Sequence, residues 1–215
     1  PRRALLRAEA ARWDRLAADA GRWADTVLCV TDQDRELFRA AGARDAVTVP
    51  LGIDTRSLRP VTCDPTSRQL LFVGSFAHPP NREAAALLCD RIWPDLATHL
   101  PGWSLVLAGP GSREFLASRA PAPPGLAAAG FVDDLDQLFA RSRLFLAPLF
   151  SGGGIKIKIL EAMARGLPLV TTPIGAEGIA TRAQDLAGWA ESSEEFVART
   201  VEMATDPDLA AGRAV

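Results

Sequence analysis

Short, almost wholly apolar runs recur along the chain from residue 70 onward. They occupy residues 70–73, 104–108, 126–132, 144–147 and 167–171. Runs of this kind are typical of strands that are buried on both faces of a parallel sheet. Apolar residues at helical spacing separate most of the runs, at residues 81–100, 134–142 and 155–165. Because strands and helices alternate, the pattern predicts an α/β domain with a doubly wound, Rossmann-like parallel sheet.

The first fifty residues carry a different pattern. Leucine, alanine and tryptophan recur at helical spacing over residues 2–24, with arginines and acids between them. The acids on the polar face of this amphipathic helix favour packing on a domain over contact with a membrane surface. The pattern then predicts a strand at 26–30, a helix at 33–41 that Thr31 or Asp32 caps and Gly42 ends, and a strand at 46–49.

The composition changes again at Pro50. From there to Arg68, proline, threonine, serine and aspartate are frequent, which indicates a linker between two domains. The sequence therefore predicts three parts: the end of a first domain at residues 1–50, a linker at 51–68, and a second domain at 69–215. Since the chain opens with Pro1 and not with methionine, we expect an interior piece of a longer polypeptide.

Charge and cysteine content narrow the classes of function. The 215 residues carry a formal net charge of -2, so we do not expect the broad basic surface that a nucleic-acid partner needs. Cys29, Cys63 and Cys89 are odd in number, far apart and without metal-ligand spacing. Such cysteines predict free thiols in a reducing, cytoplasmic compartment. No apolar run reaches the ~18 residues of a candidate membrane-spanning helix.

Both lysines of the chain, Lys156 and Lys158, follow three glycines at 152–154. Glycines let a backbone approach a ligand closely, and a helix that begins here would direct its free N–H groups at an anion. The pattern therefore predicts a site for a phosphorylated ligand. Residues 155–159 also alternate like a strand with solvated lysines, and the glycines would also suit a flexible linker. The helical continuation to Gly166 favours the helix over both alternatives.

Lys158 and Glu161 lie three residues apart and share one face of this expected helix. One interpretation is a surface salt bridge between them. The other is that Lys158 binds a diphosphate while Glu161 accepts hydrogen bonds from ribose hydroxyls, as in many nucleotide pockets. The chemistry of these residues leaves both interpretations open.

Three stretches resemble a known family. Residues 130–178, with the glycine-lysine-glutamate pattern, look like the donor-binding domain of retaining GT-B glycosyltransferases of family 4. Residues 47–54 resemble the interdomain segment of that family, and residues 71–75 with Pro80 and Asn81 resemble the first strand and turn of its nucleotide domain. The resemblance implies the C-terminal half of a two-domain GT-B enzyme, preceded by part of the N-terminal, acceptor-binding domain and truncated before its closing helix.

The activity implied by the resemblance is transfer of a sugar from a nucleoside diphosphate donor to an acceptor, with retained anomeric configuration and without a metal ion or other cofactor. The second glutamate of the family's Glu-x7-Glu motif falls on Glu161, which is expected at the ribose. The first glutamate falls on Gly153, so the carboxylate that would touch the donor sugar is absent. The expected catalytic residues are Lys158, which would stabilise the leaving diphosphate, and Glu161.

Further donor contacts are carried over by position. The backbone amides of residues 153–156, which include Gly154 and Ile155, would bind the diphosphate together with the side chain of Lys156. The family's basic residues after the first strand have no match at Gly74 and Ser75. The nearest candidate is Arg82. The alternative is that Arg82 is an ordinary surface arginine and Asn81 a helix cap. Phe131 and Val132 would flank the base, although burial in the core would also explain them.

The resemblance also suggests partners. They are a nucleotide-sugar donor and a glycan, lipid or small-molecule acceptor in polysaccharide or glycan biosynthesis, with a peripheral site at the inner face of the membrane. Because the acceptor domain is mostly absent, we expect donor binding without transfer. The alternative hypotheses are an epimerase-like or hydrolysing GT-B enzyme, a non-catalytic nucleotide-sugar-binding protein, and a dinucleotide-binding module. The last would need a Gly-x-Gly-x-x-Gly pattern after the first strand, which residues 74–78 lack. His78 and His99 have no partners for hydrolysis and are expected in surface or capping roles.

Overall fold

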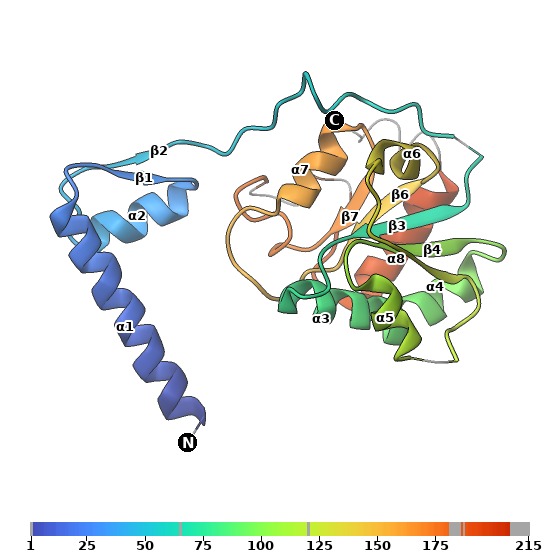
Figure 1. Cartoon of the computed structure of the whole chain (residues 1–215), viewed down its shortest axis with the longest axis horizontal. Helices are drawn as coiled ribbons and strands as arrows, with labels where there is room; N and C mark the ends of the chain where they lie inside the picture. Colours follow the sequence, from blue (N-terminus) through green and yellow to red (C-terminus); the bar gives the residue numbers. More distant parts are fainter. Residues whose placement is uncertain (1, 65, 120, 181–185, 187, 207–215) are drawn as a thin grey trace. The chain divides into compact units, whose positions relative to one another are not determined.

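The computed structural model describes residues 2–64, 66–119, 121–180, 186 and 188–206, with side chains from residue 7 onward. The chain divides into two compact units, Pro1–Gly52 and Ile53–Val215, which Figure 1 shows in blue and in green to red. Each unit has its own sheet. The expectation of a truncated C-terminal end concerns residues 207–215, which lie outside the described residues.

The first unit is a small parallel α/β arrangement. It contains α1 (Arg2–Trp23), β1 (Val27–Cys29), α2 (Asp32–Ala40) and β2 (Ala46–Thr48). Strands β1 and β2 pair in parallel, and Cys29 lies opposite Thr48. Thr31, and not Asp32, is the N-cap of α2, because its Oγ1 accepts a hydrogen bond of 3.0 Å from the backbone N–H of Asp34.

Helix α1 packs against the rest of the first unit through Gly21. A Cβ atom on Gly21 would lie 3.1 Å from the Cβ of Ala43, so the helix approaches the end of α2 closely. Its tryptophans do not take part in this packing, because Trp13 is 64% and Trp23 80% exposed. These two residues do not pack on the described part of the first unit, and the expectation that the apolar face packs on a domain stays a prediction.

The second unit is built on a six-stranded parallel sheet in the order β5-β4-β3-β6-β7-β8. The strands are β3 (Gln69–Val73), β4 (Ser104–Ala108), β5 (Leu126–Gly130), β6 (Leu144–Ala147), β7 (Leu169–Thr171) and β8 (Gly188–Trp189). In the central pairs, Leu71 lies opposite Val106 on one side and Phe145 on the other. The strand order reverses between β3 and β6, which confirms the expected doubly wound α/β fold.

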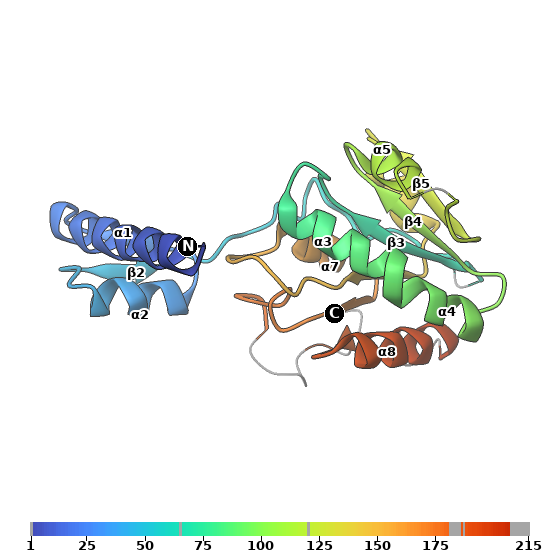
Figure 2. The ribbon, with the colours of Figure 1, turned by 90° about the horizontal axis from the view of Figure 1, so that it is seen from below.

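Helices cover both faces of this sheet. They are α3 (Pro79–Leu87), the π-helical turn η1 (Leu88–Ile92), α4 (Trp93–His99), α5 (Ser112–Ala117), α6 (Leu135–Ala140), α7 (Ile157–Ala164) and α8 (Ser193–Thr205). Figures 1 and 2 show α3, α4 and α8 on one face, with α4 in contact with α8, and α6 and α7 on the other. The sheet is therefore shielded from water on both sides.

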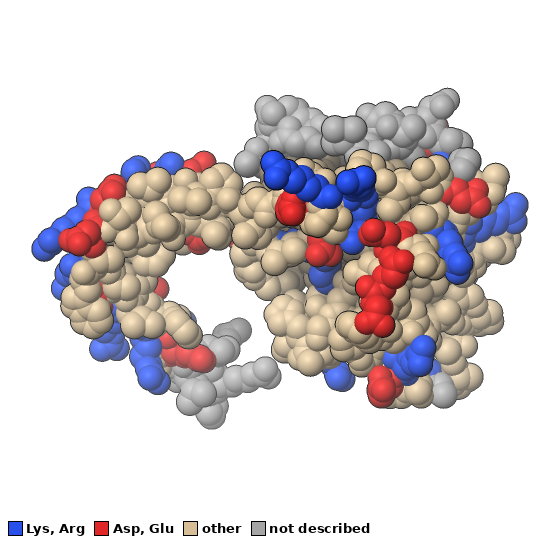
Figure 3. All heavy atoms as spheres, turned by 45° about the horizontal axis from the view of Figure 1, so that its top comes forward, with Lys and Arg blue, Asp and Glu red and all other residues tan. Residues whose placement is uncertain are grey.

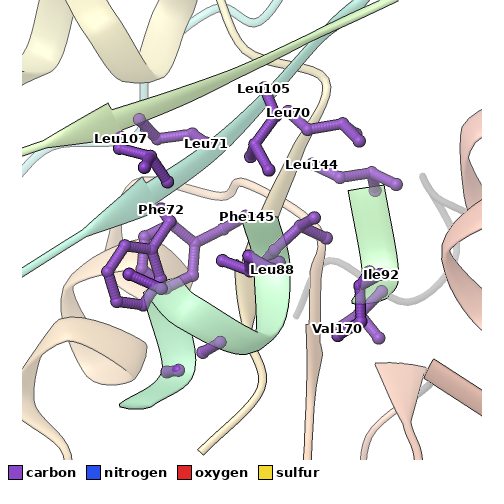
Figure 4. Close-up of a cluster of buried hydrophobic side chains, with 14 of the residues drawn as sticks. Leu70, Leu71, Phe72, Leu88, Ile92, Leu105, Leu107, Leu144, Phe145 and Val170 are labelled. Atoms are coloured by element: carbon purple, nitrogen blue, oxygen red, sulfur yellow. The ribbon is translucent and has the colours of Figure 1, made fainter. Parts of the chain in front are cut away.

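The core explains the apolar runs of the sequence. Leu70, Leu71 and Phe72 are consecutive in β3 and all fully buried. Successive side chains point to opposite faces of the sheet, and helices cover both faces. In Figure 4 these three residues lie among side chains from β4, β6 and β7 and from η1, where Leu88 and Ile92 project toward the sheet. Burial on both faces removes the alternation that would otherwise mark a strand.

The helix expected at 81–100 is continuous but irregular. It begins earlier, at Pro79, and continues through η1 to His99. The π-helical turn has a local cause: Pro94 occupies the first turn of α4, lacks an N–H, and its ring would clash with a regular helical carbonyl four residues earlier. The N–H of Trp93 accordingly donates to the carbonyl of Leu88, five residues back.

Other boundaries differ from the sequence expectation. The strand expected at 126–132 ends at Gly130, whose φ of 77° is outside the extended region. The helix expected from residue 155 begins only at Ile157. Elements α5, β8 and α8 were not expected from the sequence. Residues of the expected linker are hydrogen-bonded to the second unit, where the N–H of Val61 donates to the carbonyl of Arg165 at 2.9 Å.

The distribution of surface charge and the state of the cysteines agree with what the composition led us to expect. Figure 3 shows basic and acidic side chains interspersed over the visible face of each unit, with no broad basic area among the atoms described. All three cysteines are free, with Cys29 and Cys89 buried and Cys63 half-buried. The helices that the structure describes are too short or too polar to traverse a bilayer.

Candidate functional site

A pocket lies at the carboxyl ends of the central strands of the second unit. In a doubly wound sheet, ligands bind at the point where the strand order reverses, here between β3 and β6. A cavity of about 340 Å³ opens between the start of α3 and the loop that joins β6 to α7. It is lined by His78, Pro80, Asn81, Leu149, Ser151, Gly152, Gly153, Ile155, Lys156, Ile157 and Lys158.

Lys158 lies in the first turn of α7 and is largely buried at one wall of the cavity. Its Nζ donates a hydrogen bond to the side-chain oxygen of Asn81 and lies 4.8 Å from the centre of the Phe72 ring. Burial lowers the pKa of Lys158 to about 8. No carboxylate of the described residues forms an ion pair with this ammonium group. Within the described part of the chain, the charge of this cation in the cavity wall is therefore not compensated.

Asn81 connects Lys158 to the turn after β3. Its Nδ2 donates to the carbonyl of Ser75 at 3.0 Å, while its oxygen accepts from Lys158. Gly74 lies directly beside both side chains, since a Cβ atom at this position would be 2.9 Å from the Lys158 Nζ and equally close to Asn81. A Cβ atom on Gly109, after β4, would lie 2.1 Å from the carbonyl oxygen of Gly74. Position 109 therefore requires glycine, because the obstacle is main chain, whereas a side chain at position 74 would displace the side chains of Asn81 and Lys158.

The three glycines of the loop have different roles. Gly152 and Gly154 have φ angles of 102° and 74°, which L side chains rarely adopt. Gly153 has no such constraint, and a Cβ atom there would meet nothing within 4 Å. At the start of the loop, the hydroxyl of Ser151 donates to the carboxylate of Glu83 on α3. The loop therefore has a defined shape and leaves open space at position 153.

Lys156 differs from Lys158 in its partners. It is the N-cap residue of α7, its side chain is 9% exposed, and its Nζ lies 2.8 Å from a carboxylate oxygen of Glu177. The same Nζ donates to the carbonyl of Gly154 at 2.6 Å. From the sequence, both lysines were expected to bind the diphosphate, with Lys158 in the leading role. In the structure the charge of Lys156 is already balanced by Glu177.

Glu161 lies one turn further along α7. Its nearest ion-pair partner is Arg165, at 3.9 Å, and Arg165 also binds Asp136 at 2.8 Å. The i,i+3 salt bridge with Lys158 that the sequence allowed is not among the ion pairs of the described residues. With its side chain 32% exposed, Glu161 is accessible but does not line the cavity.

The other expected donor contacts lie outside the cavity lining. Arg82, in α3, is exposed, and its guanidinium carbon lies 5.9 Å from the centre of the Phe115 ring. Phe131 follows the end of β5 and is 68% exposed, so the alternative that it is a core residue is wrong, whereas Val132 is half-buried. The assignment of Ser75, Arg82, Phe131 and Val132 to a donor stays a prediction.

Three residues of the site were not assigned a role in ligand binding from the sequence. Asn81 was considered only as a cap, His78 only as a surface or capping residue, and Glu177 not at all. His78 is the N-cap of α3 without a side-chain capping bond, and it also lines the cavity. Glu177 follows β7 between two glycines, and a carboxylate just after a buried strand was the signal that could have indicated it.

A family model for glycosyl transferases group 1 matches residues 67–206, more than half of the chain. The chain belongs to this family. The match includes the cavity, both lysines and the loop after β7. A phosphatidyl-myo-inositol mannosyltransferase of Mycolicibacterium smegmatis is 28% identical over 156 residues, which are 69% of this chain and 40% of that protein. The chain thus spans less than half the length of this group 1 relative.

Solved structures show the same fold. Anabaena HepE, in a complex with UDP-glucose, matches with a TM-score of 0.70 and 19% identity over 94% of this chain and 60% of HepE. TarM matches with a TM-score of 0.76 and 12% identity over 92% of this chain and 40% of TarM. WaaG, a glycosyltransferase involved in lipopolysaccharide biosynthesis, matches with a TM-score of 0.63 and 21% identity over 87% of this chain and 55% of WaaG. The fold of the chain is therefore that of GT-B glycosyltransferases.

Proposed function

We propose that this protein is part of a glycosyltransferase that moves a sugar from a nucleoside diphosphate donor to an acceptor with retained anomeric configuration, and that its second unit binds the donor. The observation that carries this proposal is Lys158. It is a largely buried cation with no carboxylate partner among the described residues, at the N-terminus of a helix and beside a glycine loop. An uncompensated positive charge in such a place favours a bound anion.

The roles of the residues follow from the chemistry of sugar transfer. When the bond between the anomeric carbon and the donor phosphate breaks, negative charge grows on the leaving diphosphate and must be stabilised. Lys158 and the free N–H groups at the start of α7 are suited to this task. Lys156, paired with Glu177, keeps the loop carbonyl of Gly154 in place. We assign Glu161 to the ribose hydroxyls, since its carboxylate is accessible and, among the described residues, has Arg165 as its one ion-pair partner.

The relatives support this proposal. HepE is described with UDP-glucose, the pneumococcal transferase GtfA with UDP and GlcNAc, and the mycolicibacterial relative as a mannosyltransferase acting on phosphatidyl-myo-inositol. We extend the proposal to a glycan, lipid or small-molecule acceptor held by another part of the full-length protein. We also propose a cytoplasmic location with a peripheral site at the inner membrane face, and chemistry that needs no metal ion or other cofactor.

The test is binding of UDP, GDP and ADP to the 215-residue chain by calorimetry. We expect Lys158→Ala to weaken the nucleoside diphosphate that binds best by about 1.5–3 kcal/mol, the usual value of a hydrogen bond to a charged group. Lys156→Ala is the matched control and should have a smaller effect, because Glu177 already balances its charge. The proposal is wrong if the parent chain binds no nucleoside diphosphate, or if Lys158→Ala binds as tightly as the parent.

A further inference from the structure

Position 153 lacks a carboxylate but not the space for one. Gly153 lines the cavity, and a Cβ atom there would meet nothing within 4 Å. A sugar presents vicinal hydroxyl groups, and a carboxylate that accepts hydrogen bonds from them binds it with charge-assisted strength. A carboxylate from another element would provide the same charge-assisted bonds.

The loop after β7 brings a carboxylate, that of Glu177, into contact with Lys156, a residue of the cavity lining. Its turn is anchored by the hydroxyl of Thr172, which donates to the carbonyl of Leu149, a residue of the cavity, and accepts from the N–H of Gly175 at 3.1 Å. The N–H of Ala176 donates to the carbonyl of Thr172 at 2.9 Å. These bonds fix the backbone that carries Glu177 at the carboxyl end of the sheet.

Glu177 is held beside the glycine loop by one ammonium group. The Lys156 Nζ binds the Glu177 Oε2 at 2.8 Å and the Gly154 carbonyl at 2.6 Å, so both oxygens share one cation. The other carboxylate oxygen, Oε1, accepts no hydrogen bond from the residues that the structure describes. Since the side chain is 32% exposed, this oxygen is accessible to a ligand.

We propose that Glu177 contacts the sugar of the bound donor and supplies, from the loop after β7, the carboxylate that position 153 lacks. This inference rests on the proposed function. Lys156 is then a positioning residue, because it orients Glu177 through one oxygen and leaves the other for the sugar hydroxyls.

Glu83 is the competing candidate. It also contacts the glycine loop, through the hydroxyl of Ser151, but it lies on the exposed side of α3, and none of the cationic side chains that the structure describes pairs with its carboxylate. The two glutamates therefore provide a matched pair: each touches the loop by a side-chain contact, and each can be replaced by the isosteric glutamine without a change of volume.

The experiment compares two affinities in each variant of the 215-residue chain. By calorimetry we measure the dissociation constants of UDP, UDP-glucose, GDP and GDP-mannose for the parent. The variants are then measured with the pair, UDP and UDP-glucose or GDP and GDP-mannose, that the parent binds. Glu177→Gln should weaken the nucleotide sugar about tenfold, as expected for loss of a charge-assisted hydrogen bond, while the free diphosphate changes less than about threefold. Glu83→Gln should leave both constants within about threefold of the parent.

The possible outcomes separate the two proposals. Equal weakening of sugar and free diphosphate in Glu177→Gln, or no weakening, overturns this inference and leaves the proposed function intact. A sugar-specific loss in Glu83→Gln overturns it as well. A parent chain that binds none of these four ligands and no ADP overturns the proposed function and this inference with it. The folding control is thermal unfolding, in which each variant should have the same midpoint temperature as the parent.

Discussion

Two lysines that are two residues apart have opposite electrostatic situations. Lys156 is paired with the carboxylate of Glu177, whereas the hydrogen-bond partner of Lys158 is a neutral amide and its ring neighbour, Phe72, supplies only a weak attraction. An amide oxygen orients an ammonium group but does not balance its charge. Lys158 therefore combines a fixed position with a free charge, which is the combination that an anion site needs.

This situation predicts a pH dependence of ligand binding. Burial lowers the pKa of Lys158 to about 8, so the free protein loses this positive charge as the pH rises through that value. A terminal phosphate group is already almost fully ionised there, because its second pKa is about 6. We expect the affinity for the nucleoside diphosphate to be highest below pH 7.5 and to fall between pH 7.5 and 9.5, measured at constant ionic strength.

Lys158→Ala provides the control for this pH series. Without the titrating amine, its weaker affinity should change little over the same interval. If parent and variant show the same fall in affinity, another group is responsible, and Lys158 does not carry the charge that binds the ligand.

At the scale of elements, helix α7 joins the site to the core. Ile159 and Ala162 are fully buried on one side of the helix, while Ile157 is 54% exposed beside the cavity. The buried side fixes the position of the helix, and thereby the place of Lys158 and of the glycine loop.

The two isoleucines of α7 allow a matched test. Ile159→Ala should lower the free energy of unfolding by about 2–4 kcal/mol, because it leaves a cavity in a close-packed core. Ile157→Ala removes the same atoms from a half-solvated position and should change it by less than about 0.5 kcal/mol. Urea unfolding measures both. Similar losses for the two variants would show that α7 is not held through Ile159.

The elements also show what the sequence could predict. The central strands were recognisable because burial on both faces makes their residues apolar without interruption, as in Leu70–Phe72. Helix α8 was missed although Ser192 caps it and accepts from the N–H of Glu195 at 3.2 Å, a spacing that the sequence displays. Strand β8 has two residues, too few for any periodic pattern.

For the site, the sequence indicated the loop but not the pairing within it. Asn81 is 77 residues before Lys158, and Glu177 is 21 residues after Lys156. Which lysine meets the amide and which meets the carboxylate depends on the order of the strands, because that order decides which loops become neighbours. No local pattern contains this information.

At the scale of the whole molecule, the two units differ in the size of their cores. In the described part of the first unit, Cys29 and Ala46 are the buried apolar side chains, whereas the second unit contains an extended cluster of leucines and phenylalanines. Stability from apolar burial grows with the buried area, so the first unit is expected to open more easily.

The cysteines report on each unit separately. Cys29 is buried in the first unit and Cys89 in the second, and burial raises the pKa of both thiols, that of Cys89 to about 11. In pulsed thiol labelling with increasing urea, we expect Cys29 to react at a lower concentration than Cys89. A saturating nucleoside diphosphate should protect Cys89 and leave Cys29 unchanged, because only the unit that binds it is stabilised.

Simultaneous reaction of the two thiols, or equal protection of both by the ligand, would contradict this prediction. It would show that the units unfold as one cooperative body. Cys63 is half-buried and should react before either of them, which provides an internal check of the labelling chemistry.

The contact between Gly74 and Gly109 also limits how this protein can evolve. A side chain on Gly109 would collide with the backbone of its neighbour, and one on Gly74 would collide with Asn81 and Lys158. Because the obstacle at Gly109 is main chain, no second substitution can relieve it. A lineage that keeps this pocket can therefore accept a side chain at the open Gly153, but it must keep glycine at position 109. In a library of random variants, those that still bind an anion should retain glycine at position 109.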